Sequence, residues 1–325
     1  VIQGTENAEV IDGTDAAERI EARGGNDWIR PMLGNDTVDG GAGNDMIDFL
    51  SQQEVAGRRV VDYMLNLDLE EGLATLFSGE ENVLLNIERV TGTIFADFIK
   101  GDSGANHIRG LGDYDWFIAT EGNDTLDGGN GQDMLSLLEW GGTSAATLVD
   151  VFAFNGAPPS GAAVNGVVLD LADGSNNSGL AAGQTLISIE RITGSSYQDV
   201  FYGDANQNDF RGLGGYDWFV GSSGGRERYY GGDGIDTMTY FQSTSGVIAS
   251  LRNGAGTFNG QETGYGSGGD AARDLYFEIE NLVGTNYDDR LEGNSERNQL
   301  AGLDGDDLIF GYGGIDRIMG GDGND

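Results

Sequence analysis

The sequence predicts an all-β protein, a solenoid of short strands joined by glycine-rich turns. Three observations predict this fold. The motif G-G-x-G-x-D-x-U-x, in which U is apolar, recurs in steps of nine residues, as in Gly40–Asp48, Gly128–Ser136 and Gly231–Thr239. Glycine is abundant, with 57 copies in 325 residues, whereas proline occurs 3 times. The segments between the motifs alternate apolar and polar residues, which is the period of a strand with one buried face. Repeats of a fixed length are typical of solenoids, in which each coil covers the next.

The nonapeptides occur in four blocks. Their sixth position carries an acidic residue or an asparagine and their eighth an apolar residue, as Asp45 and Ile47 do. We expect the eighth residue to face inward and to stack on its counterparts in other coils. We predict the blocks at residues 1–48, 92–136, 194–239 and 284–325.

Three inserts separate the blocks, at residues 49–91, 137–193 and 240–283. Each contains an alternating segment, and these segments are Val61–Leu67, Val167–Leu171 and Val247–Leu251. Each also ends on a similar hexapeptide, at Ile87–Gly92, Ile189–Gly194 and Ile279–Gly284. The period of two predicts β-hairpin-like inserts within one tandem array.

The net charge and the lack of a long apolar run argue against two classes of partner. The chain carries 54 acidic and 17 basic side chains, giving a formal charge of −37. Nucleic acid is not expected as a partner, because phosphate binding needs a basic surface. Insertion into a membrane is not expected either, because the sequence has no apolar run of about 18 residues. A folded chain with this charge repels itself, so we expect a cation to join it on folding.

The nonapeptides resemble those of the RTX, or haemolysin-type, calcium-binding family of secreted bacterial proteins. The resemblance implies a parallel β-roll, in which six residues form a turn and three form a strand. Two repeats would then make one coil, so that each repeat stacks on the next but one. It also implies calcium as the cofactor, export by type I secretion, and a location outside the bacterium or on its surface.

Position six is the expected source of calcium ligands, because Ca²⁺ takes six to eight oxygen ligands and a glycine-rich turn exposes its carbonyls. The predicted metal-site carboxylates are Asp27, Asp36, Asp45, Asp115, Asp124, Asp133, Asp217, Asp236, Asp307, Asp316 and Asp325. The predicted metal-site glycines are Gly25, Gly41, Gly43, Gly129, Gly131, Gly215, Gly232, Gly234, Gly305 and Gly314. One to three ions in each block would give roughly four to twelve calcium ions.

The repeats differ in how well they suit an ion. Repeats one, three and five of a block share one edge of the roll, and the pairs formed by repeats three and five match the motif best. Repeats one and two mostly lack the glycine at position four, where Phe95, Tyr197 and Tyr287 stand. For these the sequence leaves two readings open, an ion site or a capping turn that holds no ion.

No catalytic residue is predicted. Gly221–Gly225 matches G-x-S-x-G but falls inside a repeat turn, and His107 is the one histidine of the chain and falls at an outward position. Trp28, Trp116 and Trp218 share position seven in three blocks. They are expected either to pack against the inserts or to form a ladder of outward platforms for sugar rings.

The sequence predicts a non-enzymatic, calcium-binding extracellular scaffold or adhesive region that folds on calcium binding after secretion. Polysaccharide or other copies of the chain are its candidate partners. The alternative is the accessory region of a secreted protease, lipase or epimerase whose catalytic domain lies outside this chain. A carbohydrate-active enzyme that uses surface carboxylates is a third hypothesis. Because the sequence stops at Asp325, the sixth position of a repeat, we expect it to be part of a longer protein.

Overall fold

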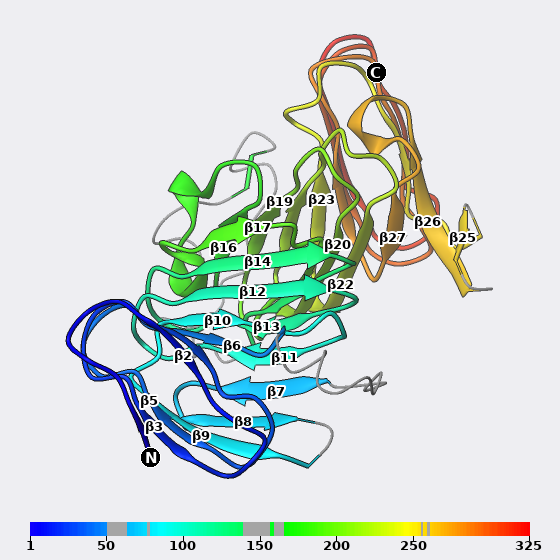
Figure 1. Ribbon diagram of the computed structural model, residues 1–325. Coiled ribbons are helices and arrows are strands. Elements are labelled where there is room, and N and C mark those ends of the chain that lie inside the picture. Colours follow the sequence, from blue (N-terminus) through cyan, green and yellow to red (C-terminus); the bar gives the residue numbers. More distant parts are fainter. Residues whose placement is uncertain (51–63, 77–78, 139–156, 159–165, 255, 259–260) are drawn as a thin grey trace. The chain divides into compact units, whose positions relative to one another are not determined.

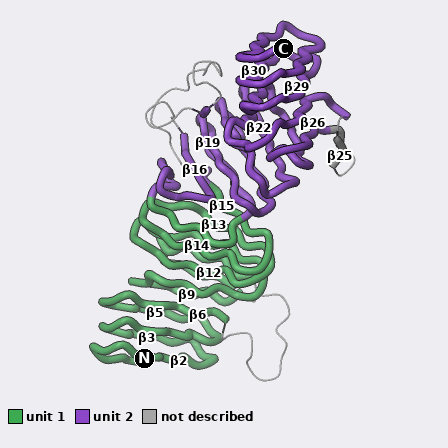
Figure 2. Tube along the Cα trace, turned by 90° about the horizontal axis from the view of Figure 1, so that it is seen from above, with its two compact units in different colours: residues 1–136, 183–189 green, residues 137–182, 190–325 purple. Residues whose placement is uncertain are grey.

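The computed structural model describes the chain except for residues 51–63, 77–78, 139–156, 159–165, 255 and 259–260. It divides into two compact units, coloured separately in Figure 2. Unit 1 comprises Val1–Ser136 and Gly183–Ile189, and unit 2 comprises Leu137–Ala182 and Glu190–Asp325. Each unit is a roll of two strand layers joined by turns, and the two are described in turn.

Unit 1 has one sheet that is parallel throughout and one that is interrupted by a hairpin (Figure 1). The parallel sheet contains, in spatial order, β2 (Val10–Asp12), β4 (Trp28–Arg30), β6 (Met46–Asp48), β10 (Arg89–Thr91), β12 (His107–Gly112), β14 (Thr125–Asn130) and β17 (Thr185–Ile187). The second contains β1 (Ile2–Gln3), β3 (Arg19–Glu21), β5 (Thr37–Asp39), β9 (Glu81–Leu85), β8 (Leu73–Leu76), β7 (Leu65–Asp68), β11 (Phe98–Lys100), β13 (Trp116–Ile118) and β15 (Met134–Ser136). Strand β8 is antiparallel to both of its neighbours, so insert one adds an antiparallel excursion to the roll.

Unit 2 repeats this design. Its parallel sheet contains β16 (Val168–Asp170), β19 (Val200–Tyr202), β21 (Trp218–Val220), β23 (Thr237–Thr239), β28 (Asn281–Val283), β30 (Gln299–Asp304) and β32 (Arg317–Asp322). The second sheet contains β18 (Arg191–Thr193), β20 (Asp209–Gly215), β22 (Arg228–Gly234), β27 (Leu275–Phe277), β26 (Gln261–Ser267), β24 (Ile248–Ser250), β29 (Arg290–Glu292) and β31 (Leu308–Phe310), and β25 (Gly256–Phe258) pairs with β26. Three short 3₁₀ helices complete the unit, η3 (Gly174–Asn176), η4 (Gly179–Ala181) and η5 (Gly269–Ala271).

The register confirms the predicted stacking of each repeat on the next but one. In unit 1, Ile11 pairs with Ile29 and Ile29 with Ile47, each step being 18 residues. Side chains at position eight form the core, and Ile29 and Ile47 are fully buried. Unit 2 fills the same column with aromatic rings, and the centroids of Phe201 and Phe219 lie 5.6 Å apart. The chain is therefore an all-β roll whose apolar interior is built by position eight, as predicted.

Each insert contributes a strand at its predicted alternating segment, β7, β16 or β24. Val61 and Tyr63 of the first segment lie outside the described residues. The inserts also contain turns that are shorter than those of the repeats. Three residues, Asn86–Glu88, join β9 to β10, and three, Glu278–Glu280, join β27 to β28. The predicted hairpin-like character is thus one part of inserts one and three, and a short half-coil is the other.

The position-seven tryptophans divide between the two expectations, since one of the three packs against an insert and does not join an outward ladder. Trp28 and Trp116 are 41% and 39% exposed, but Trp218 is 1% exposed. Trp218 packs with Val168, Val200 and other apolar residues of unit 2. Insert two brings β16 to the edge of the β19–β21 layer, and the resulting apolar contact buries the indole. His107, predicted to be exposed, is partly buried beside Arg89 and Arg109.

Candidate metal sites in the turns

Successive turns on one edge of the roll are joined by the residue at position six. One oxygen of its carboxylate accepts the backbone N–H of the position-six residue in the preceding turn. The distance from nitrogen to Oδ1 is 2.8 Å for Asp27 to Asp45, and 2.8 Å for Asp217 to Asp236. An acid at position six therefore has a structural role, because it satisfies a buried N–H group of the neighbouring coil.

The second oxygen of the same carboxylates has no hydrogen-bond donor and is buried. This holds for Oδ2 of Asp27, Asp36, Asp45, Asp115, Asp217, Asp236 and Asp307. Asp133 lies in an equivalent turn, where its Oδ1 accepts the N–H of Asp115 at 2.8 Å. A buried carboxylate oxygen without a donor is costly unless a cation stands beside it. The turns therefore fit a hard cation that takes oxygen ligands, which is the chemistry of Ca²⁺.

The glycines of these turns allow the coils to approach each other closely. A Cβ atom at Gly131 would lie 1.7 Å from the carbonyl oxygen of Asp113, and one at Gly129 would lie 2.4 Å from that of Leu111. All ten glycines predicted to belong to metal sites have a positive φ. Glycine at these positions brings backbone carbonyls of one turn against the next, so that carbonyls and carboxylates share a small volume.

Burial changes the titration of the position-six acids. It raises the pKa of Asp115 and of Asp236 to about 8, and that of Asp36 and Asp307 to about 6. Negative neighbours raise the pKa of Asp115 further, since Asp97 and Asp133 lie above and below it. A divalent cation would reverse this effect, because it favours the ionised form.

A second kind of turn carries a hydroxyl residue at position two. The Thr93 N–H donates to Oδ2 of Asp97 at 2.7 Å, and the Thr93 hydroxyl donates to Oδ1 at 2.8 Å. Equivalent bonds join Thr5 to Glu9, Thr14 to Glu18, Ser195 to Asp199 and Thr285 to Asp289. Burial raises the pKa of Asp97 to about 6 as well, so the donors, and not the pKa, separate the two kinds of turn.

A third kind of turn carries asparagine at position six. The N–H of Asp102 donates to Oδ1 of Asn106 at 2.9 Å, and Nδ2 of Asn106 donates back to Oδ1 of Asp102 at 3.1 Å. The same backbone N–H bond recurs in the turns that contain Asn208 and Asn298. Apart from the turn of Thr120 and Asp124, in the fourth repeat of block two, these turns and the hydroxyl-bonded turns are the first and second repeats of the blocks. For the repeats that the sequence left open, the structure favours capping turns that need no ion.

Three of the predicted ligands differ from the rest. Oδ2 of Asp124 accepts the Thr120 hydroxyl at 3.2 Å and Nε2 of Gln184 at 3.0 Å, so protein donors already satisfy it. Asp316 and Asp325 are more exposed, although each accepts the backbone N–H of the preceding turn through its Oδ1. We therefore place the strongest candidate sites at the seven buried Oδ2 atoms and at the equivalent turn of Asp133.

The inserts supply position-six residues that the motif did not identify. Glu88 accepts the N–H of Asp45 at 2.8 Å, and Glu280 accepts that of Asp236 at 2.8 Å. Asn82 accepts the N–H of Asp36 at 2.9 Å. Asp274 accepts the N–H of Glu227 at 3.2 Å, and a tyrosine hydroxyl, that of Tyr240, occupies its other oxygen at 2.6 Å. In the sequence, each of these residues stands two positions before an apolar residue, as position six stands before position eight. The glycines of the nonapeptide turn are missing there, so the motif does not identify them.

Among the described residues, no three acidic or histidine side chains lie close enough to hold an ion by themselves. An ion in a turn would therefore take one or two carboxylates and complete its shell with backbone carbonyls. This agrees with the glycines at positions that bring carbonyls close together.

We expect Asp115→Asn to remove bound calcium and Asp124→Asn to leave the number of bound ions unchanged. Both carboxylates are buried in block two, but Oδ2 lacks a donor at Asp115 and has two at Asp124. Native mass spectrometry in saturating calcium counts the ions directly on the folded protein. Equal losses from the two variants would contradict the distinction between the kinds of turn.

A comparison with protein families agrees with this geometry. A family model described as the RTX calcium-binding nonapeptide repeat (4 copies) matches residues 12–48, 91–113, 115–137, 188–219, 283–318 and 292–325. Among curated proteins, none matches the chain in sequence. The crystal structure of the extracellular lipase LipA from Serratia marcescens matches 85% of this chain and 37% of the lipase, at 14% identity and a TM-score of 0.22. The chain thus spans little more than a third of that protein.

Within the part of the chain that the structure describes, no helix has the length and apolar character needed to cross a membrane. The matched repeats contain the turns whose carboxylates have a buried oxygen without a donor. The chain therefore belongs to the family of proteins with RTX calcium-binding nonapeptide repeats, and its repeats bind multiple calcium ions.

Proposed function

We propose that this chain is a non-catalytic extracellular scaffold or adhesive region that folds when it meets calcium after secretion. One observation carries the proposal, namely the stack of buried carboxylates whose second oxygen has no donor. A roll with this stack and a net charge of −37 needs a cation to be stable. The free energy of calcium binding would then contribute directly to the free energy of folding.

The proposed location follows from the same coupling. Low cytoplasmic calcium would keep the chain unfolded for export through a type I channel, as the family resemblance implies. The higher calcium outside the cell would then fold it there. A folded array of stacked coils is a stiff support, and the chain would serve as a calcium-dependent spacer or surface region.

Two observations support a non-catalytic role. Gly221–Gly225, the G-x-S-x-G segment, lies in the turn between β21 and β22 and not at a strand-to-helix elbow. Most buried acids of the described residues are accounted for by bonds between neighbouring turns, as with Asp97 and Asp217, and others, such as Asp209 and Glu292, by arginine partners. No pair of them needs a catalytic role to explain its position.

A calcium titration tests the proposal. Folding is followed by circular dichroism while free calcium rises from nanomolar to millimolar. We expect a midpoint in the range of extracellular calcium modules, about 10⁻⁴–10⁻³ M. A midpoint below about 10⁻⁷ M, under the range of cytosolic calcium sensors, would mean that the chain folds before export and would contradict the proposal.

A further inference from the structure

The short turn of insert three leaves a hollow in one edge of unit 2. Glu278–Glu280 joins β27 to β28 with three residues, whereas Gly293–Asn298 joins β29 to β30 with six. A cavity of about 350 Å³ lies at this place. Tyr230 and Phe277 form one wall, with their rings stacked at a centroid distance of 4.3 Å. The hollow is thus a consequence of the missing turn residues.

A second cavity of about 340 Å³ adjoins the first. The two share Asn253, Asn294 and Glu296 as lining residues, and the second extends to Arg252 and Tyr312. Together they form a groove along the edge, which we call the turn groove. It has aromatic rings at both ends and amide and carboxylate groups between them.

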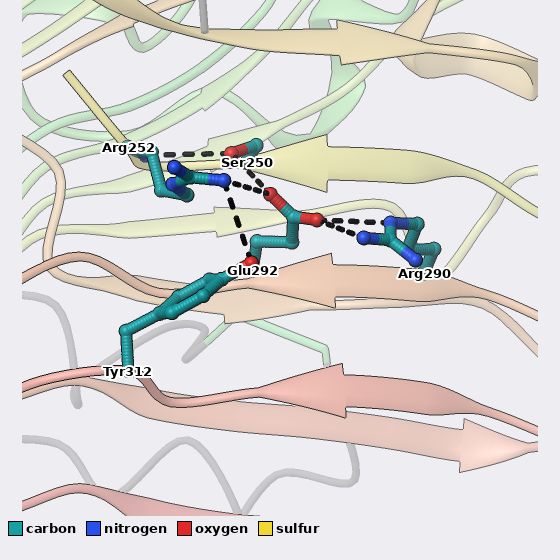
Figure 3. A network of polar contacts seen from close by, with 5 residues as sticks. All are labelled: Ser250, Arg252, Arg290, Glu292 and Tyr312. Carbon is teal, nitrogen blue, oxygen red and sulfur yellow. Dashed lines mark hydrogen bonds and ion pairs between the residues drawn. The ribbon is translucent and has the colours of Figure 1, made fainter. Parts of the chain in front are cut away.

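One end of the turn groove is held in place by a polar network (Figure 3). Glu292 accepts Nε of Arg290 at 2.9 Å through Oε1, and the Ser250 hydroxyl at 3.0 Å through Oε2. Arg252 lies 3.8 Å from the same Oε2 and donates to the Tyr312 hydroxyl at 3.5 Å. The network connects β24, β29 and the turn after β31, so this wall is formed before any ligand arrives.

Tyr312 stands at position two of its turn, where the chain also places Arg23, Met32 and other non-glycine residues with a positive φ. The φ of Tyr312 is 65°, and its side chain is 53% exposed. Left-handed backbone is unfavourable for a residue with a bulky side chain. Leu303, the second residue of the preceding repeat, also has a positive φ but packs against the core cluster around Trp218. Tyr312 is not buried in this way; its ring stacks on Phe310 at a centroid distance of 5.8 Å and lies 4.8 Å from the guanidinium carbon of Arg252, at the rim of the groove.

The chemistry of the turn groove suits a saccharide. The ring of Tyr230 already contacts Phe277 and Arg211, and that of Tyr312 contacts Phe310 and Arg252. These rings would therefore meet a sugar with their exposed edges, and Tyr312 adds a hydroxyl at the rim. The amides of Asn253 and Asn294 both donate and accept, and the carboxylates of Glu278 and Glu296 accept from hydroxyl groups. These carboxylates and Glu280 outnumber Arg252, which makes the groove unsuited to a polyanion.

We propose that the turn groove binds a segment of an oligosaccharide that carries no negative charge. The inference goes beyond the scaffold role proposed above and requires only that the coils of unit 2 are formed. It gives the region a ligand of its own, beside turns that carry candidate calcium sites.

Isothermal titration calorimetry in calcium, with defined hexamers, tests the proposal. The probes are cellohexaose, chitohexaose and a glucosamine hexamer, with hexaguluronate as the acidic sugar and hexalysine as a cationic peptide. We expect at least one of the first three to bind. Tyr312→Gly should weaken that binding at least tenfold without loss of folding, because glycine suits the backbone there. Asn253→Ala is the second variant, and Tyr114→Ala, at a 59% exposed tyrosine of unit 1, is the control.

Failure of all three sugars would overturn the proposal, as would unchanged binding by both groove variants. Binding of hexaguluronate alone, or of hexalysine alone, would replace it by an acidic sugar or a cationic segment as the ligand. Circular dichroism of the same samples, with and without calcium, separates this result from the scaffold proposal. A protein that folds without calcium and still binds a hexamer would contradict the scaffold proposal but not the proposed binding of a saccharide.

Discussion

In an excess of calcium chelator, we expect the protein to lose most of its β-structure and to expand. Seven buried carboxylate oxygens then have neither a donor nor a cation. At about 1–3 kcal/mol each, they would cost roughly 7–21 kcal/mol, which matches or exceeds the usual stability of a folded protein, about 5–15 kcal/mol. Circular dichroism and small-angle X-ray scattering measure the change.

An unfolded chain of this length has a radius of gyration of about 64 Å, and the calcium-bound protein should lie well below it. Magnesium at the same concentration is the control, because it prefers octahedral sites with retained water and does not suit a cage of carbonyls. A full strand signal in chelator, equal to that in calcium, would contradict the expectation.

Acidification should restore part of the fold in chelator. Burial raises the pKa of Asp115 and Asp236 to about 8 and that of Asp36 to about 6, whereas an unfolded aspartate titrates near its ordinary value of 3.8. Between these values the folded state binds more protons, so its stability rises as pH falls. We expect more strand signal in chelator at pH 5.5 than at pH 8.5. With calcium present the dependence should be opposite, because protons then compete with the ion.

The sequence predicted the repeated part of the fold because two positions decide it. Position eight forms the core, as Ile47 does, and position six links the turns, as Asp45 does, and both roles follow from spacing alone. The edges of the roll could not be predicted. Asp45 belongs to an odd repeat of block one, whereas Asn106 and Asp124 belong to even repeats of block two. The short turn Asn86–Glu88 places all three residues in one stack, so the even repeats of block two lie on the edge that the odd repeats of block one occupy.

The sequence could not separate turns that need an ion from those that do not, because the motif emphasises glycines. The deciding feature is the residue at position two. A threonine there, as at Thr93, donates to the acid at position six, and a leucine, as at Leu111, cannot. Nor could the sequence decide between the two expectations for Trp218. Its burial depends on β16, which comes from an insert 50 residues earlier in the chain, and no local pattern reports such a contact.

Gly131→Ala should destabilise the protein by about 3 kcal/mol or more, because a backbone clash inside a packed turn cannot relax easily. The new Cβ would lie 1.7 Å from the carbonyl oxygen of Asp113, so one of the two backbones must move. Their separation is part of the space in which Asp115 and Asp133 would meet an ion. Loss of stability and loss of calcium affinity should therefore appear together, in urea unfolding at several calcium concentrations.

Gly112→Ala is the matched control, since it changes a glycine of the adjoining turn in the same way. Its Cβ would lie 3.6 Å from the nearest atom, the carbonyl oxygen of Ile94, which is ordinary contact. We expect a change within about 0.5 kcal/mol and an unaltered calcium midpoint. If both variants lost the same stability, the cause would be glycine's general flexibility. If Gly131→Ala alone lost it, and raised calcium could not fully restore it, the cause would be the close approach of carbonyls on which the ion depends.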